Sequence, residues 1–412
     1  MKRKGLWSTL VFAFLSVSLI VALIVTGCGP KAPAKEVIKI GFSRSLSGWA
    51  AVASEPEQES VILWSEMVNA QGGIYVKEYG KKLPVQLIYY DDKSSPEEAV
   101  RIYEKLITVD KVDVLFPPSQ TAQNIATIGI CEKYHMPLLA ATCGSSRGRE
   151  VGAKYWWAIT PIGASWMSKE NGLASLLKNY TAEIKKVAIL TLHDPFPMEC
   201  RQAIVTYLGE LGMSVVVDKD YPIDVKDLSE VLLDIKGKNV DALLGLSYPG
   251  DCFLITEQSM GIGLSPKFMY FLVGPGTNAF IPIFGPATEG VCGMGTYSAA
   301  ANIPGAKEYY DNMVKRWGHP PDLLNGADGW HAAQLMQLAI EKAGTLNPEK
   351  IRDVLATEEF QTIEGPVRLR NGINELAIPG VIQWQKGMAQ VVWPSERATA
   401  KFVFPKPEWP KK

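Results

Sequence analysis

Short apolar runs rich in β-branched residues alternate along the chain with longer stretches whose apolar residues recur at helical spacing. Residues 37–42 form the first run, and residues 57–71 the first helical stretch, with Val61, Trp64 and Val68 on its apolar face. The same alternation predicts strands at 85–89, 112–116 and 137–141 and helices at 96–109 and 121–134. Strands that alternate with helices in this way are typical of the α/β class, in which helices cover a parallel sheet.

A second series of the same kind begins near Ala158. It predicts strands at 187–192, 214–217, 242–246 and 268–273 and helices at 200–211, 228–236 and 252–260. Two successive series imply two lobes. The rest of the chain predicts helices at 306–317, 328–343 and 348–356, then strands at 367–369, 381–385 and 390–393. Ligands of open α/β sheets gather at the carboxyl ends of the strands, so a site is expected in the loops that follow them.

The first residues have the layout of a secretory signal, in which Lys2, Arg3 and Lys4 precede an apolar run over residues 10–25. The run is short for a membrane-spanning helix, so an uncleaved anchor helix is the weaker alternative. Val25-Thr26-Gly27-Cys28 resembles the bacterial lipobox. That resemblance implies a lipoprotein signal peptide over residues 1–27 and acylation of Cys28. The Pro- and Ala-rich residues 28–36 then form a tether.

Charge and cysteine content narrow the class of protein. Removal of residues 1–27 leaves 39 basic and 43 acidic residues, a net charge of −4, which is no footprint for nucleic acid. Five cysteines remain, with no C-x-x-C pair, and we interpret them as buried small residues, with one bridge left open: Cys131, Cys143, Cys200, Cys252 and Cys292. The four histidines do not pair at ligand spacing, and no phosphate-binding glycine motif occurs. The sequence therefore predicts no metal and no cofactor.

One motif raises an enzymatic alternative, because residues 144–148 read G-S-S-R-G, the spacing of a nucleophile elbow around Ser146. An elbow needs a helix directly after the serine, and residues 150–154 are too few for one. His193 and His331 are the only later histidines that fit as bases. We therefore keep a serine hydrolase as the third hypothesis and expect no enzyme activity.

Most of the mature chain resembles the branched-chain amino acid (Leu/Ile/Val) binding family of periplasmic proteins. The resemblance lies in the order and spacing of short stretches at residues 38–41, 45–48, 69–74, 90–92, 111–113, 187–190, 227–229, 240–242, 289–291, 340–344 and 392–394. It covers about nine tenths of the mature length.

The resemblance implies a type I periplasmic binding protein, a Venus-flytrap of two doubly wound Rossmann-like lobes joined by three crossovers. Crossovers near residues 158, 288 and 365 would place residues 37–158 and 288–364 in the first lobe and residues 159–287 and 365–412 in the second. Members deliver a small ligand to a membrane permease driven by ATP hydrolysis, usually without metal. The implied protein is therefore an exported, membrane-anchored substrate-binding lipoprotein of an ABC importer. A ligand sensor that signals to a membrane receptor needs the same closure and is the second hypothesis.

The resemblance also carries over ligand-binding positions. The hydroxyl of Thr121, five residues before Ala126, matches the group that holds a ligand carboxylate, and the start of its helix supplies N–H groups for an anion. Ser119 or Thr121 alone is equally consistent with a helix cap. The full candidate set is Ser47, Trp49, Ser119, Gln120, Thr121, Ala141, Thr142, Cys143, Phe196, Tyr248, Asp251 and Gly276.

One position departs from the family pattern. Gly276 follows Gly274-Pro275, where the family has the glutamate that pairs with an amino acid's ammonium. A buried ammonium without a carboxylate is costly, so either Asp251 or Glu289 substitutes or the ligand is another small carboxylate or an amide. The expected ligand class is therefore an amino acid, amide or small organic acid.

Overall fold

The computed structural model describes residues 35–301 and 303–410. Residues Val37–Lys412 form one unit, and the segment before it lies almost wholly outside the described residues, as do the expected signal peptide and Cys28. Within the described ranges no helix combines the length and apolar character needed to cross a bilayer.

The first lobe is built on two sheets. In one, β1 lies between β4 and β5, and all three strands run parallel: Ile38–Arg44, Val85–Asp91 and Val114–Leu115. The other has the order β13, β14, β15, β7, β6, with bounds Glu359–Thr362, Gly365–Arg370, Ile373–Asn374, Trp156–Ala158 and Leu138–Ala140. A small antiparallel hairpin of β2 and β3 covers Ile74–Val76 and Lys81–Leu83.

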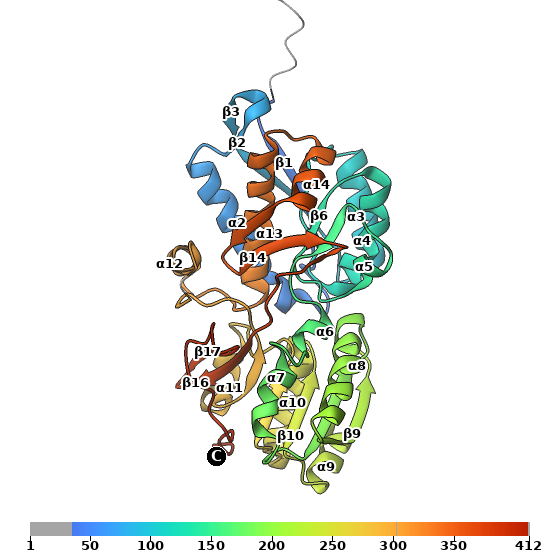
Figure 1. Ribbon diagram of the computed structural model, residues 1–412, viewed down its shortest axis with the longest axis vertical. Coiled ribbons are helices and arrows are strands. Elements are labelled where there is room, and N and C mark those ends of the chain that lie inside the picture. Colours follow the sequence, from blue (N-terminus) through green and yellow to red (C-terminus); the bar gives the residue numbers. More distant parts are fainter. Residues whose placement is uncertain (1–34, 302, 411–412) are drawn as a thin grey trace, which may run out of the picture. The chain divides into compact units, whose positions relative to one another are not determined.

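Helices lie on both faces of the first lobe's strands. α2 packs on α13, and α3 packs on α4, as two separate pairs (Figure 1). The helices of this lobe are α2 (Ala51–Ala70), α3 (Pro96–Thr108), α4 (Thr121–Tyr134), α5 (Arg147–Glu150), α12 (Ala306–Trp317), α13 (Asn325–Ala343) and α14 (Pro348–Thr357). Two buried apolar clusters result, one beneath each helix pair.

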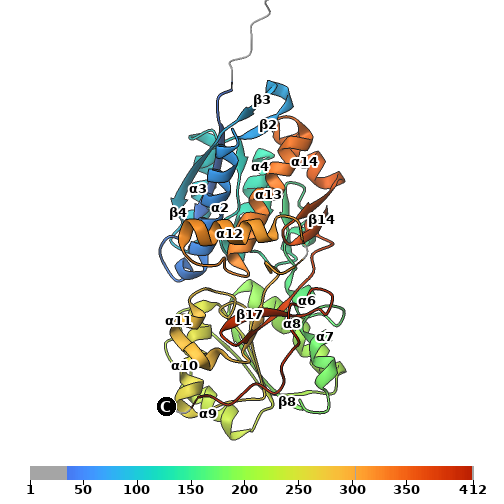
Figure 2. The same ribbon diagram turned by 90° about the vertical axis from the view of Figure 1, so that its left-hand side faces the viewer.

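The second lobe has a single seven-stranded sheet in the order β17, β16, β12, β11, β10, β8, β9. These strands cover Met388–Trp393, Val381–Gln385, Cys292–Met294, Phe268–Phe271, Ala242–Leu246, Lys186–Leu192 and Ser214–Tyr221. α6 (Gly163–Trp166), α7 (Leu173–Leu177) and α8 (Pro195–Glu210) gather on one side, and α9 (Ser229–Gly237), α10 (Pro249–Ile262) and α11 (Phe280–Phe284) on the other (Figure 2). The central parallel strands β10 and β11 are buried along their whole length, and β8 is buried after Lys186.

Strand pairing places two of the three crossovers later in the chain than residues 288 and 365. β12 lies in the second lobe's sheet, next to β11, while β14 and β15 continue the first lobe's sheet beside β7. The core clusters agree, because Cys292 packs with the second lobe and Val367 with the first. We therefore propose lobe boundaries after Met294 and after Asn374.

The predicted α/β class and two-lobe fold are confirmed, and the helices predicted at 121–134 and 306–317 have these bounds in the structure. The helix predicted from residue 57 instead begins at Ala51, with Pro56 inside it. Proline lacks the N–H that would reach the carbonyl of Val52 four residues earlier.

All five described cysteines are buried and unbridged, as their interpretation as small core residues required. Burial raises the pKa of each thiol, to about 12 for Cys143. Neutral thiols in apolar surroundings are inert, so these cysteines act through packing.

Candidate functional site

A cavity lies where the carboxyl ends of strands from both lobes meet. Its empty volume is about 420 Å³, part of which is continuous with solvent. The lining residues follow β5, β6, β7, β8, β10 and β11, end β12, or lie at the starts of α2 and α13: Ala53, Ser119, Gln120, Thr121, Ala141, Thr142, Cys143, Gly144, Thr160, Trp166, Phe196, Tyr248, Val273, Met294, Leu324, Asn325 and Asp328. Eight of the twelve predicted site residues are among them.

The strand order explains why these loops converge. In the first lobe β1 lies between β4 and β5, and in the second β8 lies between β9 and β10. The two strands that come next in the chain therefore lie on opposite sides of the central strand. The crevice at such a reversal is the usual ligand position in open α/β sheets. Ser119 follows β5, and Tyr248 follows β10, so each lobe contributes the loop at its own reversal.

The start of α4 gives the cavity hydrogen-bond donors. Gln120 is the residue before the helix, and it supplies no side-chain cap. The first N–H groups of a helix have no acceptor within it, and its N-terminus favours negative charge. The Thr121 hydroxyl is 3.5 Å from the carbonyl oxygen of Thr142, a weak contact, and it also interacts with the Tyr248 hydroxyl. The arrangement suits a carboxylate.

A buried ion pair lies behind this helix start. Arg44 Nη1 is 2.5 Å from Glu57 Oε1, and both side chains are fully buried. The same nitrogen donates to Ser119 Oγ at 3.0 Å, and Ser119 Oγ is also 2.6 Å from Ser54 Oγ. Burial raises the pKa of Glu57, while Arg44 opposes the rise. Ser119 therefore links the cavity wall to a fixed polar network.

The loop after β6 is fixed by hydrogen bonds that use its own polar atoms. Thr160 Oγ1 donates to the carbonyl of Ala141 at 2.6 Å, and Thr142 Oγ1 donates to the carbonyl of Pro118 at 3.3 Å. At Gly144 the loop meets the ring of Phe196, and a side-chain Cβ there would overlap that ring. Gly144 thus permits the close approach of the two lobes in this wall.

Tyr248 forms the second lobe's wall. Its hydroxyl donates to Asp194 Oδ1 at 2.7 Å, and its ring stacks on Trp49 of the first lobe at a centroid distance of 5.4 Å. Burial raises the pKa of Asp194, and the Tyr248 hydroxyl partly offsets that rise. Trp49 does not line the cavity but covers the ring that does.

Three predicted site residues lie elsewhere. Ser47 is exposed, and its hydroxyl donates to Asp91 at 2.6 Å, so it orders the loop after β1. Asp251 does not border the cavity, because it folds back to accept the N–H of Tyr248 at 3.0 Å and the hydroxyl of Tyr221 at 2.5 Å. Gly276 borders a different, largely apolar hollow, and Glu289 accepts the N–H of Lys386.

Asn325 and Asp328 are cavity residues that the sequence reasoning did not single out. Both lie in the first turn of α13, with only 6% and 3% of their surface exposed. Leu324 and Trp166 add apolar surface, and Thr160 adds a hydroxyl already bonded to Ala141. Polar residues at the start of an otherwise buried helix were the available signal for Asn325 and Asp328.

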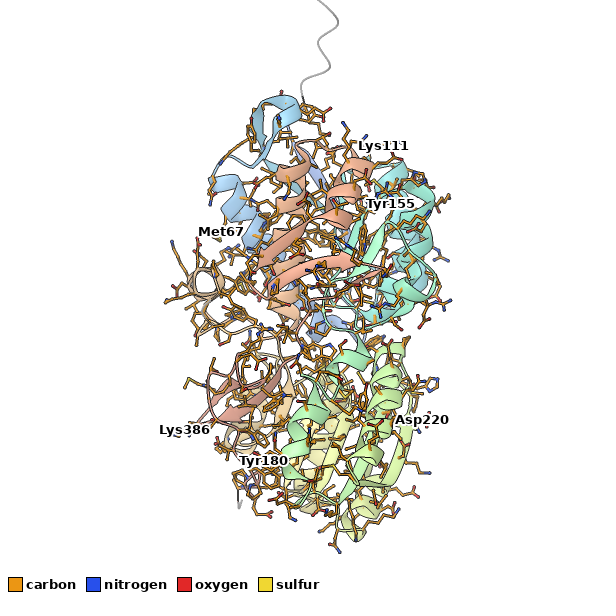
Figure 3. All side chains as sticks on the ribbon, viewed as in Figure 1. Met67, Lys111, Tyr155, Tyr180, Asp220 and Lys386 are labelled. Carbon is orange, nitrogen blue, oxygen red and sulfur yellow. The ribbon has the colours of Figure 1, made fainter. Side chains whose placement is uncertain are left out.

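The serine of the nucleophile-elbow motif is hydrogen bonded to a carboxylate and not to a histidine. The Ser146 hydroxyl donates to Glu150 Oε1 at 2.7 Å, and α5 after it has only four residues. His193 instead lies 3.2 Å from Asp220, and His331 lies 3.2 Å from Glu364. Asp220 is on the edge strand β9, where Figure 3 labels it. Neither histidine is hydrogen bonded to Ser146. Across the described ranges no three His, Cys, Asp or Glu side chains are placed to hold a metal ion.

Two doubly wound lobes that close their strand-end loops around a small polar cavity define the class of two-lobed solute-binding proteins. The model of the periplasmic binding protein family matches residues 37–378, and the chain belongs to this family.

Relatives and solved structures agree on the fold. A Leu/Ile/Val-binding protein homolog of Brucella melitensis is 21% identical over 94% of this chain and 98% of its own length. The branched-chain amino acid transporter substrate binding protein of Streptococcus pneumoniae, solved with isoleucine, superposes with a TM-score of 0.75 at 21% identity, covering 87% of this chain and 100% of that one. A solute binding protein of R. palustris, solved with benzoate, superposes with a TM-score of 0.76 at 18% identity. This similarity covers 89% of this chain and 98% of that one.

Proposed function

We propose that this chain is the extracytoplasmic substrate-binding protein of an ABC importer and that it closes its two lobes around a small carboxylate, amide or amino acid. The observation that carries the proposal is the cavity walled by strand-end loops of both lobes, with Thr121 and the start of α4 on one side and Tyr248 and Phe196 on the other. Such a cavity is complete only when the lobes are together. Ligand binding and closure are therefore one event.

A carboxylate on the ligand is supported by the chemistry of the α4 start. Thr121 contributes a hydroxyl whose contact with the Thr142 carbonyl is long, and the helix contributes N–H groups and a favourable dipole. Isoleucine and benzoate, the ligands named for two similar structures, both carry a carboxylate. They differ beside the carboxylate, where only isoleucine has an ammonium on the adjoining carbon.

Catalysis is not part of the proposal. Acyl transfer by Ser146 would need an effective base within hydrogen-bond reach of its hydroxyl. That hydroxyl donates to Glu150, whose pKa is lowered by Ser146 and Arg147, so the carboxylate is a weak base. Turnover of generic acyl esters that Ser146→Ala abolishes would revive the hydrolase hypothesis.

The ligand is tested by denaturing the purified protein and identifying the small molecules that it releases by mass spectrometry. The identified compound is then added back to ligand-free protein, and small-angle scattering should give a smaller radius of gyration at saturation. A compound of another class, such as a nucleotide, or saturation without contraction would contradict the proposal.

Membrane attachment rests on Cys28, which lies outside the described residues. Cys28→Ser removes the thiol that acylation needs, so the protein should leave the membrane fraction while its affinity for the identified ligand stays unchanged. A Cys131→Ser variant is the matched control, because that cysteine is buried in the first lobe. Retention of the Cys28→Ser protein at the membrane after processing would refute the lipid anchor.

A further inference from the structure

The first turn of α13 presents polar groups to the cavity that the protein itself leaves incompletely bonded. Asn325 Nδ2 is buried and has no acceptor among residues 35–301 and 303–410. Asp328, one helical turn later, also borders the cavity. Buried polar groups without partners are rare, because each costs the free energy of its lost hydration. Their position on a ligand cavity indicates that a ligand completes them.

Asp328 touches a second carboxyl, that of Glu364, which lies in the turn between β13 and β14. Asp328 Oδ1 and Glu364 Oε1 each lack a hydrogen-bond donor among the described groups. Two carboxyls in contact cannot both ionise at low cost, and they are stabilised when they share one proton. Burial, and then Glu364, raise the pKa of Asp328 well above its ordinary value.

The other acidic groups near Asp328 interact with partners of their own. Glu57 of α2 is paired with Arg44, and the Asp322 carboxylate accepts the N–H of Leu324 at 2.8 Å. The pKa of Asp322 is raised to about 6, mainly by burial. Neither group supplies a positive charge to Asp328, and both Glu57 and Asp322 oppose its ionisation.

The positive groups on the far side face Glu364 rather than Asp328. His331 Nδ1 lies 3.2 Å from Glu364 Oε2, and Arg397 Nη2 donates to the backbone carbonyl of Glu364 at 3.2 Å. The Tyr309 hydroxyl is bonded to Ser60. The groups that act most strongly on Asp328 are therefore other carboxyls, and within residues 35–301 and 303–410 no cation is paired with it.

We infer that Asp328 receives a positively charged nitrogen of the ligand, which displaces the proton that Asp328 shares with Glu364, while Asn325 Nδ2 donates to an acceptor beside that nitrogen. This inference rests on the proposed function and adds to it a class of ligand: a small molecule with a cationic nitrogen. The displaced proton passes to the buffer, the nitrogen keeps its own protons, and the new carboxylate accepts from it. Asp328 thus takes the role for which Gly276 has no side chain.

Proton release distinguishes this arrangement from a merely polar wall. Calorimetric titrations near pH 7 in buffers of different ionisation enthalpy count the protons released. The probes are matched pairs that differ in the ammonium: leucine and 4-methylpentanoate, phenylalanine and 3-phenylpropanoate, with 3-methylbutylamine and 2-phenylethylamine as amines. The expected result is release of up to about one proton with the ammonium-bearing member and none with its deaminated partner.

Asp328→Asn should abolish that release. The substitution should weaken binding of the ammonium-bearing member of each pair by about 10- to 100-fold and change the affinity for the deaminated acid little. Asp251→Asn is the matched control, because Asp251 is a buried acid that does not border the cavity. This variant should keep both the proton release and the preference for the ammonium-bearing ligand. If Asp328→Asn does not fold, the number of protons that the wild-type protein releases on ligand binding still tests the inference.

Equal affinity for both members of each pair, or ammonium binding without proton release, overturns the inference and leaves the proposed function standing. Failure of every cationic probe to bind also overturns it. The proposed function fails separately, when the released native compound belongs to another class or saturation produces no contraction.

Discussion

The indole of Trp49 lies against the ring of Tyr248 with an interplanar angle of 21° and a centroid distance of 5.4 Å. Trp49 follows β1 in the first lobe, and Tyr248 follows β10 in the second, so this stack joins the two lobes at the cavity wall. Stacked aromatic pairs contribute about 0.5 to 1.5 kcal/mol beyond the area they bury.

Trp49→Ala should therefore weaken binding of the identified ligand by about 2- to 10-fold, because the closed form loses a contact that the open form does not make. Calorimetry measures the affinity, and Trp49→Phe should restore part of it. Tyr75→Ala is the control, an exposed aromatic on β2 away from the cavity. Equal affinity of Trp49→Ala and wild type would show that the stack does not favour closure.

Gly144→Ala should impair closure because its Cβ would overlap the Phe196 ring. We expect an affinity loss of about 10-fold or more, with little change in the thermal midpoint of the ligand-free protein. Gly129→Ala on α4, where a Cβ meets nothing, is the control. The double variant Gly144→Ala/Phe196→Ala should contract on ligand addition more fully than Gly144→Ala alone, and failure to do so would place the clash elsewhere.

Regular elements were predictable from the sequence, because their spacing of apolar residues is itself the cause of their burial. The helix at 121–134 and the strand at 242–246 have their predicted bounds. The lobe of β12 and of β14 was not predictable, since strands of three to six residues take their place from a distant partner. Pairing across the chain leaves no local signal.

Part of the candidate site was predictable because its residues lie in loops that follow strands. Thr121 and Tyr248 follow strands, and all such loops meet at one edge of a sheet. Asp251 was misplaced, because its carboxylate turns back to the Tyr248 N–H at the start of α10 instead of facing the cavity. Asp328 was not singled out because Glu364, the carboxyl that it contacts, is distant in the sequence.

The stability of the protein should fall with rising pH through Asp251. Its pKa is raised from 3.8 to about 7, chiefly by burial, and the Tyr221 and Tyr248 hydrogen bonds oppose the rise. A raised carboxyl pKa gives stability that is full below about pH 4 and is lost as the pH rises through about 7, on the order of a few kcal/mol.

Asp251→Asn lacks this ionisation, so its unfolding free energy should change less between pH 5 and about pH 8 than that of wild type. Chemical denaturation at several pH values measures the difference. Asp311→Asn, an exposed substitution on α12, is the control and should follow wild type. Parallel profiles for Asp251→Asn and wild type would mean that Asp251 stays ionised in the folded protein.

The Thr121 hydroxyl should contribute one hydrogen bond to a ligand carboxylate. Thr121→Ala removes it without changing the N–H groups at the start of α4, so affinity for the identified carboxylate should fall by about 1 to 2 kcal/mol. Thr121→Ser keeps the hydroxyl and should retain most of the affinity. Calorimetry with the carboxylate and with its primary amide separates charge from shape.

The carboxylate and its amide should respond differently to the same substitution. A hydrogen bond to a charged oxygen is roughly twice as strong as one to a neutral oxygen, so Thr121→Ala should reduce the preference for the carboxylate over the amide. Thr108→Ala on α3 is the control, because its hydroxyl donates to the backbone of Glu104 on the surface. An equal loss for both ligands would mean that Thr121 only shapes the wall, and the carboxylate would then be held by the helix N–H groups alone.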